Sequence, residues 1–167
     1  MSKSYFEKIN LNVFKEINSL LDSAYKKTAK GKSFIETLTL QFTVIDLFLK
    51  FAIIKKLNEN NNNKAQKHLE KDLMFGQLIK IADIVGFDHK IITDLNKYNE
   101  KRINLVHKLL TTYKNLNQAN IDAKNNVKLG MKILVNLMIY MNLKLFSKEE
   151  QKELKRLAKD FKKEKND

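Results

Sequence analysis

The sequence predicts an all-α fold, a compact bundle of about five to six helices, and two observations carry that prediction. The chain of 167 residues contains no proline and only four glycines, so little interrupts helical periodicity, and strand-rich folds need more turn residues than this. Apolar residues also recur every three or four positions over long stretches, the pattern of helices with one buried face. A chain of this length fits one domain, to which we assign residues 1–167.

Capping and turn residues predict three helices in the first half of the chain, over residues 4–30, 33–57 and 65–85. The first two open with capping-box patterns, and Gly31 and Gly86 are suited to end the first and third because glycine tolerates a left-handed backbone. The second is apolar nearly all round, so we expect it at the centre of the bundle. Polar side chains such as Asp46 and Lys50 interrupt it, so it falls short of a membrane span. The asparagine-rich residues 58–63 are predicted to form a surface loop.

Three more helices are predicted in the second half, over residues 89–115, 122–145 and 147–167. Asp88 is placed to cap the first of them, residues 117–120 separate it from the next, and the last is a charged C-terminal helix with a fraying end. On the helix over residues 89–115, one apolar stripe is expected to face the core: Leu95, Tyr98, Val106, Leu109, Leu110 and Tyr113. Asn99 and Arg102 fall within this stripe.

The formal charge of +13 favours contact with a polyanion, since lysine and arginine bind nucleic acids by neutralising phosphates. The alternative is that AT-rich coding sequence produced the abundant lysine and asparagine without selection for binding. The chain has no cysteine and its first residues lack the apolar run of a signal peptide, so we expect a cytoplasmic protein. Neither a glycine-rich phosphate loop nor a metal-ligand motif is present, and we expect no metal and no cofactor.

Arg102 is one of only two arginines in a chain that otherwise uses lysine for its positive charges. A charge on a core-facing stripe is costly unless it is paired, so Arg102 must meet a carboxylate, line a cleft or face a partner subunit. Phosphate recognition would need its planar, bidentate guanidinium. The competing interpretation is a salt bridge to a buried carboxylate such as Asp46.

His107 lies about 140° round the helix from Arg102, at the margin of the stripe. Histidine can exchange protons with a ribose hydroxyl near neutral pH, while arginine can stabilise charge that grows on a phosphate. Together the two residues could cleave RNA without a metal. The other histidines, His68 and His89, occur in a charged stretch and beside a helix start, and we assign them no role.

The arginine-to-histidine spacing from Arg102 to His107, together with residues 75–79 and 99–102, resembles the HEPN superfamily. The resemblance covers mainly residues 33–110. HEPN proteins are compact helical bundles, commonly dimeric, and many are metal-independent ribonucleases of toxin, phage-defence or RNA-processing systems. The resemblance therefore implies a HEPN-like bundle and a ribonuclease.

The resemblance also implies roles for individual residues. Arg102 would contact the phosphate and His107 would act as acid or base, with two copies of the motif meeting across a dimer interface. Supporting polar residues would come from the same part of the helix: Asn99, Glu100 and Asn104. In active members the residue after the arginine is often polar, typically asparagine, whereas here it is Ile103.

The sequence thus favours a metal-independent RNA endonuclease of the HEPN type that works as a homodimer in the cytoplasm, with no membrane association. A toxin or phage-defence role would add an antitoxin or another protein partner. Two alternatives stay open. One is a HEPN-like interaction module that has lost catalysis, which Ile103 favours. The other is a lysine-rich nucleic-acid-binding helical protein in which Arg102 forms only a structural ion pair.

Overall fold

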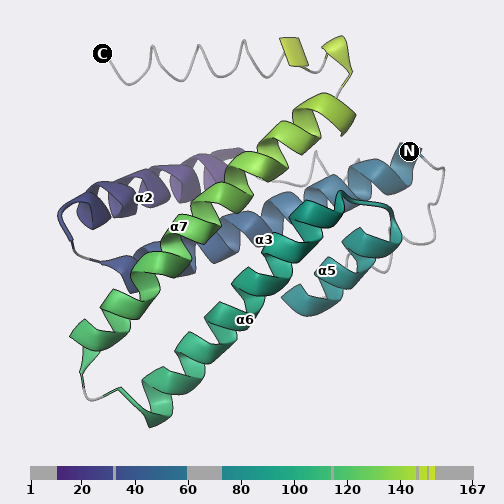
Figure 1. Cartoon of the computed structure of the whole chain (residues 1–167). Helices are drawn as coiled ribbons and strands as arrows, with labels where there is room; N and C mark the ends of the chain where they lie inside the picture. The colour runs from purple at the N-terminus through teal and green to yellow at the C-terminus, as the bar shows by residue number, and fades with distance from the viewer. Residues whose placement is uncertain are drawn as a thin grey trace, which may run out of the picture.

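The computed structural model describes residues 11–31, 33–59, 73–113, 115–145, 147–149 and 151–152. All regular secondary structure in these residues is helical, which confirms the predicted all-α bundle (Figure 1). The helices are α2 (Leu11–Ala29), α3 (Phe34–Glu59), α5 (Phe75–Ile84), α6 (His89–Thr111) and α7 (Leu116–Tyr140), and the π-helical turn η1 (Met141–Leu145) continues α7.

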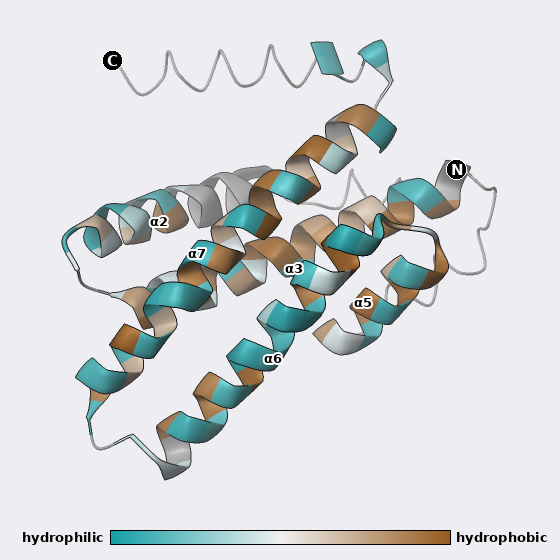
Figure 2. Ribbon diagram, viewed as in Figure 1, coloured by the Kyte–Doolittle hydropathy of each residue, from teal (hydrophilic) through white to brown (hydrophobic). Residues whose placement is uncertain are grey.

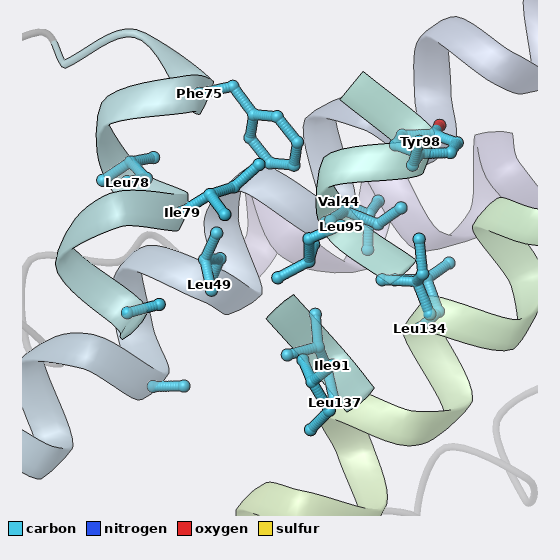
Figure 3. Packing of buried hydrophobic residues seen from close by; sticks show 14 of the residues in the cluster. Val44, Leu49, Phe75, Leu78, Ile79, Ile91, Leu95, Tyr98, Leu134 and Leu137 are labelled. Atoms are coloured by element: carbon cyan, nitrogen blue, oxygen red, sulfur yellow. The ribbon is translucent and has the colours of Figure 1, made fainter. Parts of the chain in front are cut away.

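Helix α3 is the central element, as its continuous hydrophobicity predicts. It packs against α2, α5, α7 and η1, and Figure 2 shows apolar residues around much of its surface. Its side chains Ile45 and Leu49 are completely buried. Figure 3 shows Leu49 beside Leu78 and Ile79 of α5 at the centre of the core. This burial accounts for the hydrophobicity of α3.

By length and hydropathy alone, residues Phe34–Leu57 would suffice to cross a membrane, and 56% of their most apolar stretch is buried inside the bundle. The expectation that polar interruptions make this segment too hydrophilic for a span is therefore wrong. The central helix of a bundle in water can have the same length and hydropathy as a membrane span, because a protein core and a lipid bilayer both select continuous apolar surfaces.

Gly86 ends α5 in the way the sequence predicts. Its φ is 80°, in the left-handed region, and the backbone N–H of Phe87 donates to Ala82 O at 3.0 Å while that of Gly86 donates to Asp83 O. These two bonds form a Schellman motif, which satisfies the last carbonyls of the helix. Asp88 then occupies the N-cap position of α6 as expected, but its side chain makes no capping hydrogen bond.

Three predicted boundaries are wrong. The chain is not helical at Leu73 and Met74, where the Met74 N–H donates to Gln77 Oε1 at 2.9 Å, so α5 begins at Phe75 rather than at residue 65. Helix α6 ends at Thr111 instead of residue 115. Helix α7 begins six residues before residue 122, because Asn115 caps it by accepting a hydrogen bond from Gln118 N at 3.1 Å.

The cap of α3 comes from α7. Asn120 Oδ1 accepts hydrogen bonds from the backbone N–H groups of Phe34 at 2.8 Å and Ile35 at 3.2 Å. Ser33, the expected capping residue, instead has a φ of 61°. Two predicted features lie outside the described residues: the capping box at residues 4–7, and the first part of the third predicted helix, residues 65–72. The predicted charged C-terminal helix is also outside them beyond residue 152. At its start, Gln151 N donates a hydrogen bond to Ser147 O.

Candidate functional site

Arg102 projects from α6 toward α3 and is only partly exposed. Its guanidinium carbon lies 4.1 Å from the centre of the Phe42 ring, which is a cation–π contact. One terminal nitrogen donates to Asn99 Oδ1 at 3.4 Å, one turn earlier on the same helix. The position of Arg102 on the core-facing side of α6 is therefore as predicted, and an aromatic ring and an amide hold it there.

No described carboxylate pairs with Arg102. Asp46, the candidate partner in the competing interpretation, instead binds Lys50 at 2.9 Å, one turn further along α3. The salt bridge between Arg102 and Asp46 is thus not formed. The Nε atom of Arg102 is buried and has no hydrogen-bond partner among the described residues. A buried N–H donor without a partner costs free energy, and an acceptor that reached it would recover that loss.

Two residues of α5 lie against the side chains that hold Arg102. The Phe42 ring meets the Phe75 ring edge-on, with centroids 4.8 Å apart. A side-chain carbon placed on Gly76 would lie 3.6 Å from Asn99 Nδ2, so the start of α5 closely approaches Asn99. We call these five residues, from α3, α5 and α6, the Arg102 cluster. The sequence resemblance included four of them; Phe42 was missed because an aromatic residue on a hydrophobic helix signals only core packing.

The predicted apolar stripe of α6 needs a correction. Leu95 and Tyr98 are fully buried as expected, but Val106 is 51% exposed and Leu105 is buried instead. The period that places Arg102 on the core-facing side continues to Leu105, three residues later. Burial raises the pKa of Tyr98, and the nearby Arg102 charge only partly opposes that rise.

His107 is exposed on α6, and its side chain does not contact Arg102 in any described interaction. Five helical residues separate the two side chains by about 140°, so one copy of the chain does not bring them together. Of the supporting residues, only Asn99 contacts Arg102, whereas Glu100 and Asn104 are exposed. Among the described residues, no group of three metal-ligating side chains could hold a metal ion.

Ile103 and Val106 form an exposed apolar strip on α6, with exposed fractions of 40% and 51%. On an ideal helix this strip lies between Arg102 on one side and His107 on the other. Exposed apolar side chains on a helix face are typical of binding surfaces when they adjoin polar groups. A second exposed apolar surface lies on α7, at Met131, Val135, Met138 and Ile139.

Comparison with family models, with curated proteins and with solved structures finds no match to this chain. The HEPN resemblance therefore depends on the residues around Arg102 alone and stays a prediction.

Proposed function

We propose that this protein is a metal-independent RNA endonuclease of the HEPN type that acts as a homodimer. The observation that carries the proposal is the state of Arg102: a partly buried cation, held on Phe42 and Asn99, with a buried donor that nothing in the described structure satisfies. Such a side chain is prepared to bind an anion, and a phosphate oxygen fits its planar fork.

The apolar strip supports the dimer. The point midway between Ile103 and Val106 on α6, between residues 104 and 105, is also midway between Arg102 and His107. A two-fold axis through the strip would therefore place both Arg102 side chains and both His107 side chains around one interface. Residues that do not converge in one chain would then share a composite site.

The proposed reaction uses the RNA itself as nucleophile. A ribose 2′-hydroxyl attacks the adjacent phosphorus, the bond to the leaving 5′-oxygen breaks, and a 2′,3′-cyclic phosphate and a 5′-hydroxyl end are released. His107 accepts the hydroxyl proton or supplies one to the leaving oxygen. Arg102 stabilises the negative charge that increases on the phosphoryl oxygens in the transition state. A toxin or phage-defence role, with a protein partner that restrains cleavage, would suit such an activity.

A second candidate is a HEPN-like bundle that binds RNA or a protein without cleaving it. Two observations favour it: Ile103 follows the arginine, and the contacts with Phe42 and Asn99 would also suit an arginine with a purely structural role. The two candidates share a surface and differ in chemistry.

Cleavage of single-stranded RNA in the presence of a chelator distinguishes the candidates. We expect the wild type to produce cyclic-phosphate ends and His107→Ala to be slower by about 10²- to 10⁴-fold, the usual cost of losing a positioned acid or base. His89→Ala, which removes another exposed histidine of α6, is the matched control and should cleave normally. Equal cleavage by wild type and His107→Ala would exclude the proposed mechanism through His107, and the absence of cleavage by the wild type would favour the non-catalytic bundle.

A further inference from the structure

Two ion pairs join α6 and α7, one at the buried Asp94 and one between exposed side chains. Lys132 Nζ lies 2.8 Å from Asp94 Oδ2, and Lys108 Nζ lies 3.7 Å from Asp122 Oδ2. The helices run antiparallel, as Figure 1 shows. The two pairs therefore fix the register of the helices at both ends of a shared surface.

Three lysines occupy the middle of this surface. Lys97 and Lys101 follow Asp94 by one and two turns on the same side of α6. Lys128 precedes Lys132 by one turn on α7, and the antiparallel register places it level with the turn that carries Lys97 and Lys101. All three side chains are exposed, and none has a described carboxylate partner. We call Lys97, Lys101 and Lys128 the lysine face.

The acidic residues of α6 and α7 offset only part of this positive charge. Within α6 and α7, Asp94 and Asp122 are occupied by the two ion pairs, and Glu100 is the remaining carboxylate. Beyond the lysines, Asn104 and Asn125 are exposed and level with each other in the same register. Like charges one turn apart repel each other, so an anionic ligand that reached all three lysines would relieve this repulsion.

We propose that the lysine face binds the sugar-phosphate backbone of single-stranded RNA. Lysines without base-reading neighbours recognise phosphates, and the adjacent asparagine amides can donate hydrogen bonds to the same oxygens. A surface that docks on lipid would carry large apolar side chains among its lysines, whereas asparagines lie beside these. The inference rests on the proposed function for its choice of RNA and assigns binding to a surface that does not include His107.

The test compares two triple variants in the His107→Ala background, in which cleavage is disabled. The first removes the lysine face with K97Q, K101Q and K128Q. The second removes three other exposed lysines that have no described carboxylate partner, with K30Q, K80Q and K144Q. Both lose the same net charge, so a difference between them measures position. Affinity for a short labelled single-stranded RNA is titrated over a range of salt concentrations with a chelator present.

We expect steeply salt-dependent binding by the parent protein. Each phosphate contact contributes a slope of about 0.7 in log–log plots for single strands, so removing the lysine face should lower the slope by about 2. The second variant should keep most of the slope. Equal losses in both variants, an unchanged slope in the first, or binding to anionic phospholipid vesicles in place of RNA would each overturn the assignment.

Cleavage by the wild-type protein is measured in parallel, so the two proposals can fail separately. Binding through the lysine face without cleavage would contradict the endonuclease and keep the docking surface. Cleavage by a K97Q, K101Q and K128Q variant with wild-type affinity would keep the endonuclease and eliminate the docking surface.

Discussion

Gly130 of α7 and Gln41 of α3 touch so closely that no side chain fits between them. A side-chain carbon on Gly130 would lie 2.8 Å from Gln41 Cδ and 3.0 Å from Tyr98 Cε2. Gln41 is itself fully buried, and its amide nitrogen donates to Val127 O at 2.9 Å and to the Tyr25 hydroxyl. The close approach of α3 and α7 therefore depends on this glycine.

Gly130→Ala should destabilise the protein. The added methyl group must displace Gln41 and its hydrogen bonds, and overpacking of this kind costs about 1–3 kcal/mol, more than the gain of about 1 kcal/mol from better helix propensity. Chemical denaturation would measure the free energy of unfolding. Gly76→Ala is the control, since its new carbon would make only an ordinary contact at 3.6 Å. If the two variants unfold at the same denaturant concentration, the packing argument is wrong.

Asn120→Ala should cost about 1 kcal/mol of stability, the usual value of an N-cap. The reason is that Phe34 N–H and Ile35 N–H lose their acceptor, although both groups belong to a different helix. Asn117→Ala removes another asparagine from the first turn of α7, where the side chain is exposed. Thermal unfolding of both variants tests the cap, and a loss of stability at residue 117 equal to that at residue 120 would contradict it.

Arg102→Lys should impair RNA cleavage strongly. Lysine keeps the charge and loses the bidentate fork, so only a requirement for the guanidinium makes the substitution harmful. Phe42→Leu should slow RNA cleavage by a smaller factor than Arg102→Lys, because it removes the ring that positions the guanidinium and leaves the arginine in place. Rates are measured in a chelator with saturating RNA. Full activity of Arg102→Lys would mean that the site needs charge alone.

Ile103→Asp should dissociate the proposed homodimer. In a symmetric interface each carboxylate would face a second copy of the same apolar strip, where burying a charge is costly. Val135→Asp places the same charge on the exposed apolar surface of α7 and serves as the matched control.

Light scattering at micromolar concentration gives the mass of each variant. A dimer that survives Ile103→Asp and is lost in Val135→Asp would move the interface to α7. The two Arg102 clusters would then be separated, and the composite site would be abandoned. A wild-type protein that is monomeric at this concentration would remove the composite site as well.

The large elements of the fold were predictable because their signals are strong. Continuous hydrophobicity identified α3 as the central helix, and Gly86 marked the end of α5 through the one conformation that favours glycine. The start of α7 was not predictable in the same way. Asparagine serves both as a loop residue and as a helix cap, and only the bond from Gln118 N to Asn115 shows which role it takes here.

From local spacing alone, the candidate site was predictable only along α6. A spacing of three residues places Asn99 beside Arg102 on any helix, and their hydrogen bond confirms this. The neighbouring aromatic rings come from α3 and α5, and their approach depends on how the helices pack, which no local pattern encodes. Val106 was assigned to the core for the same reason: the side of α6 that packs on its neighbours carries Leu105 instead.

The cap that Asn120 places on α3 also bears on synthesis at the ribosome. Phe34 and Asn120, 86 positions apart, must meet before the first turn of α3 has its capping hydrogen bonds. Helix α7, which carries Asn120 and covers α3, is translated last among the described core helices. During the intervening period the long apolar helix α3 is present without its cover, and exposed apolar surface of this kind promotes aggregation. Nascent chains that stop before α7 should therefore depend on chaperones, while chains that include it should fold without them.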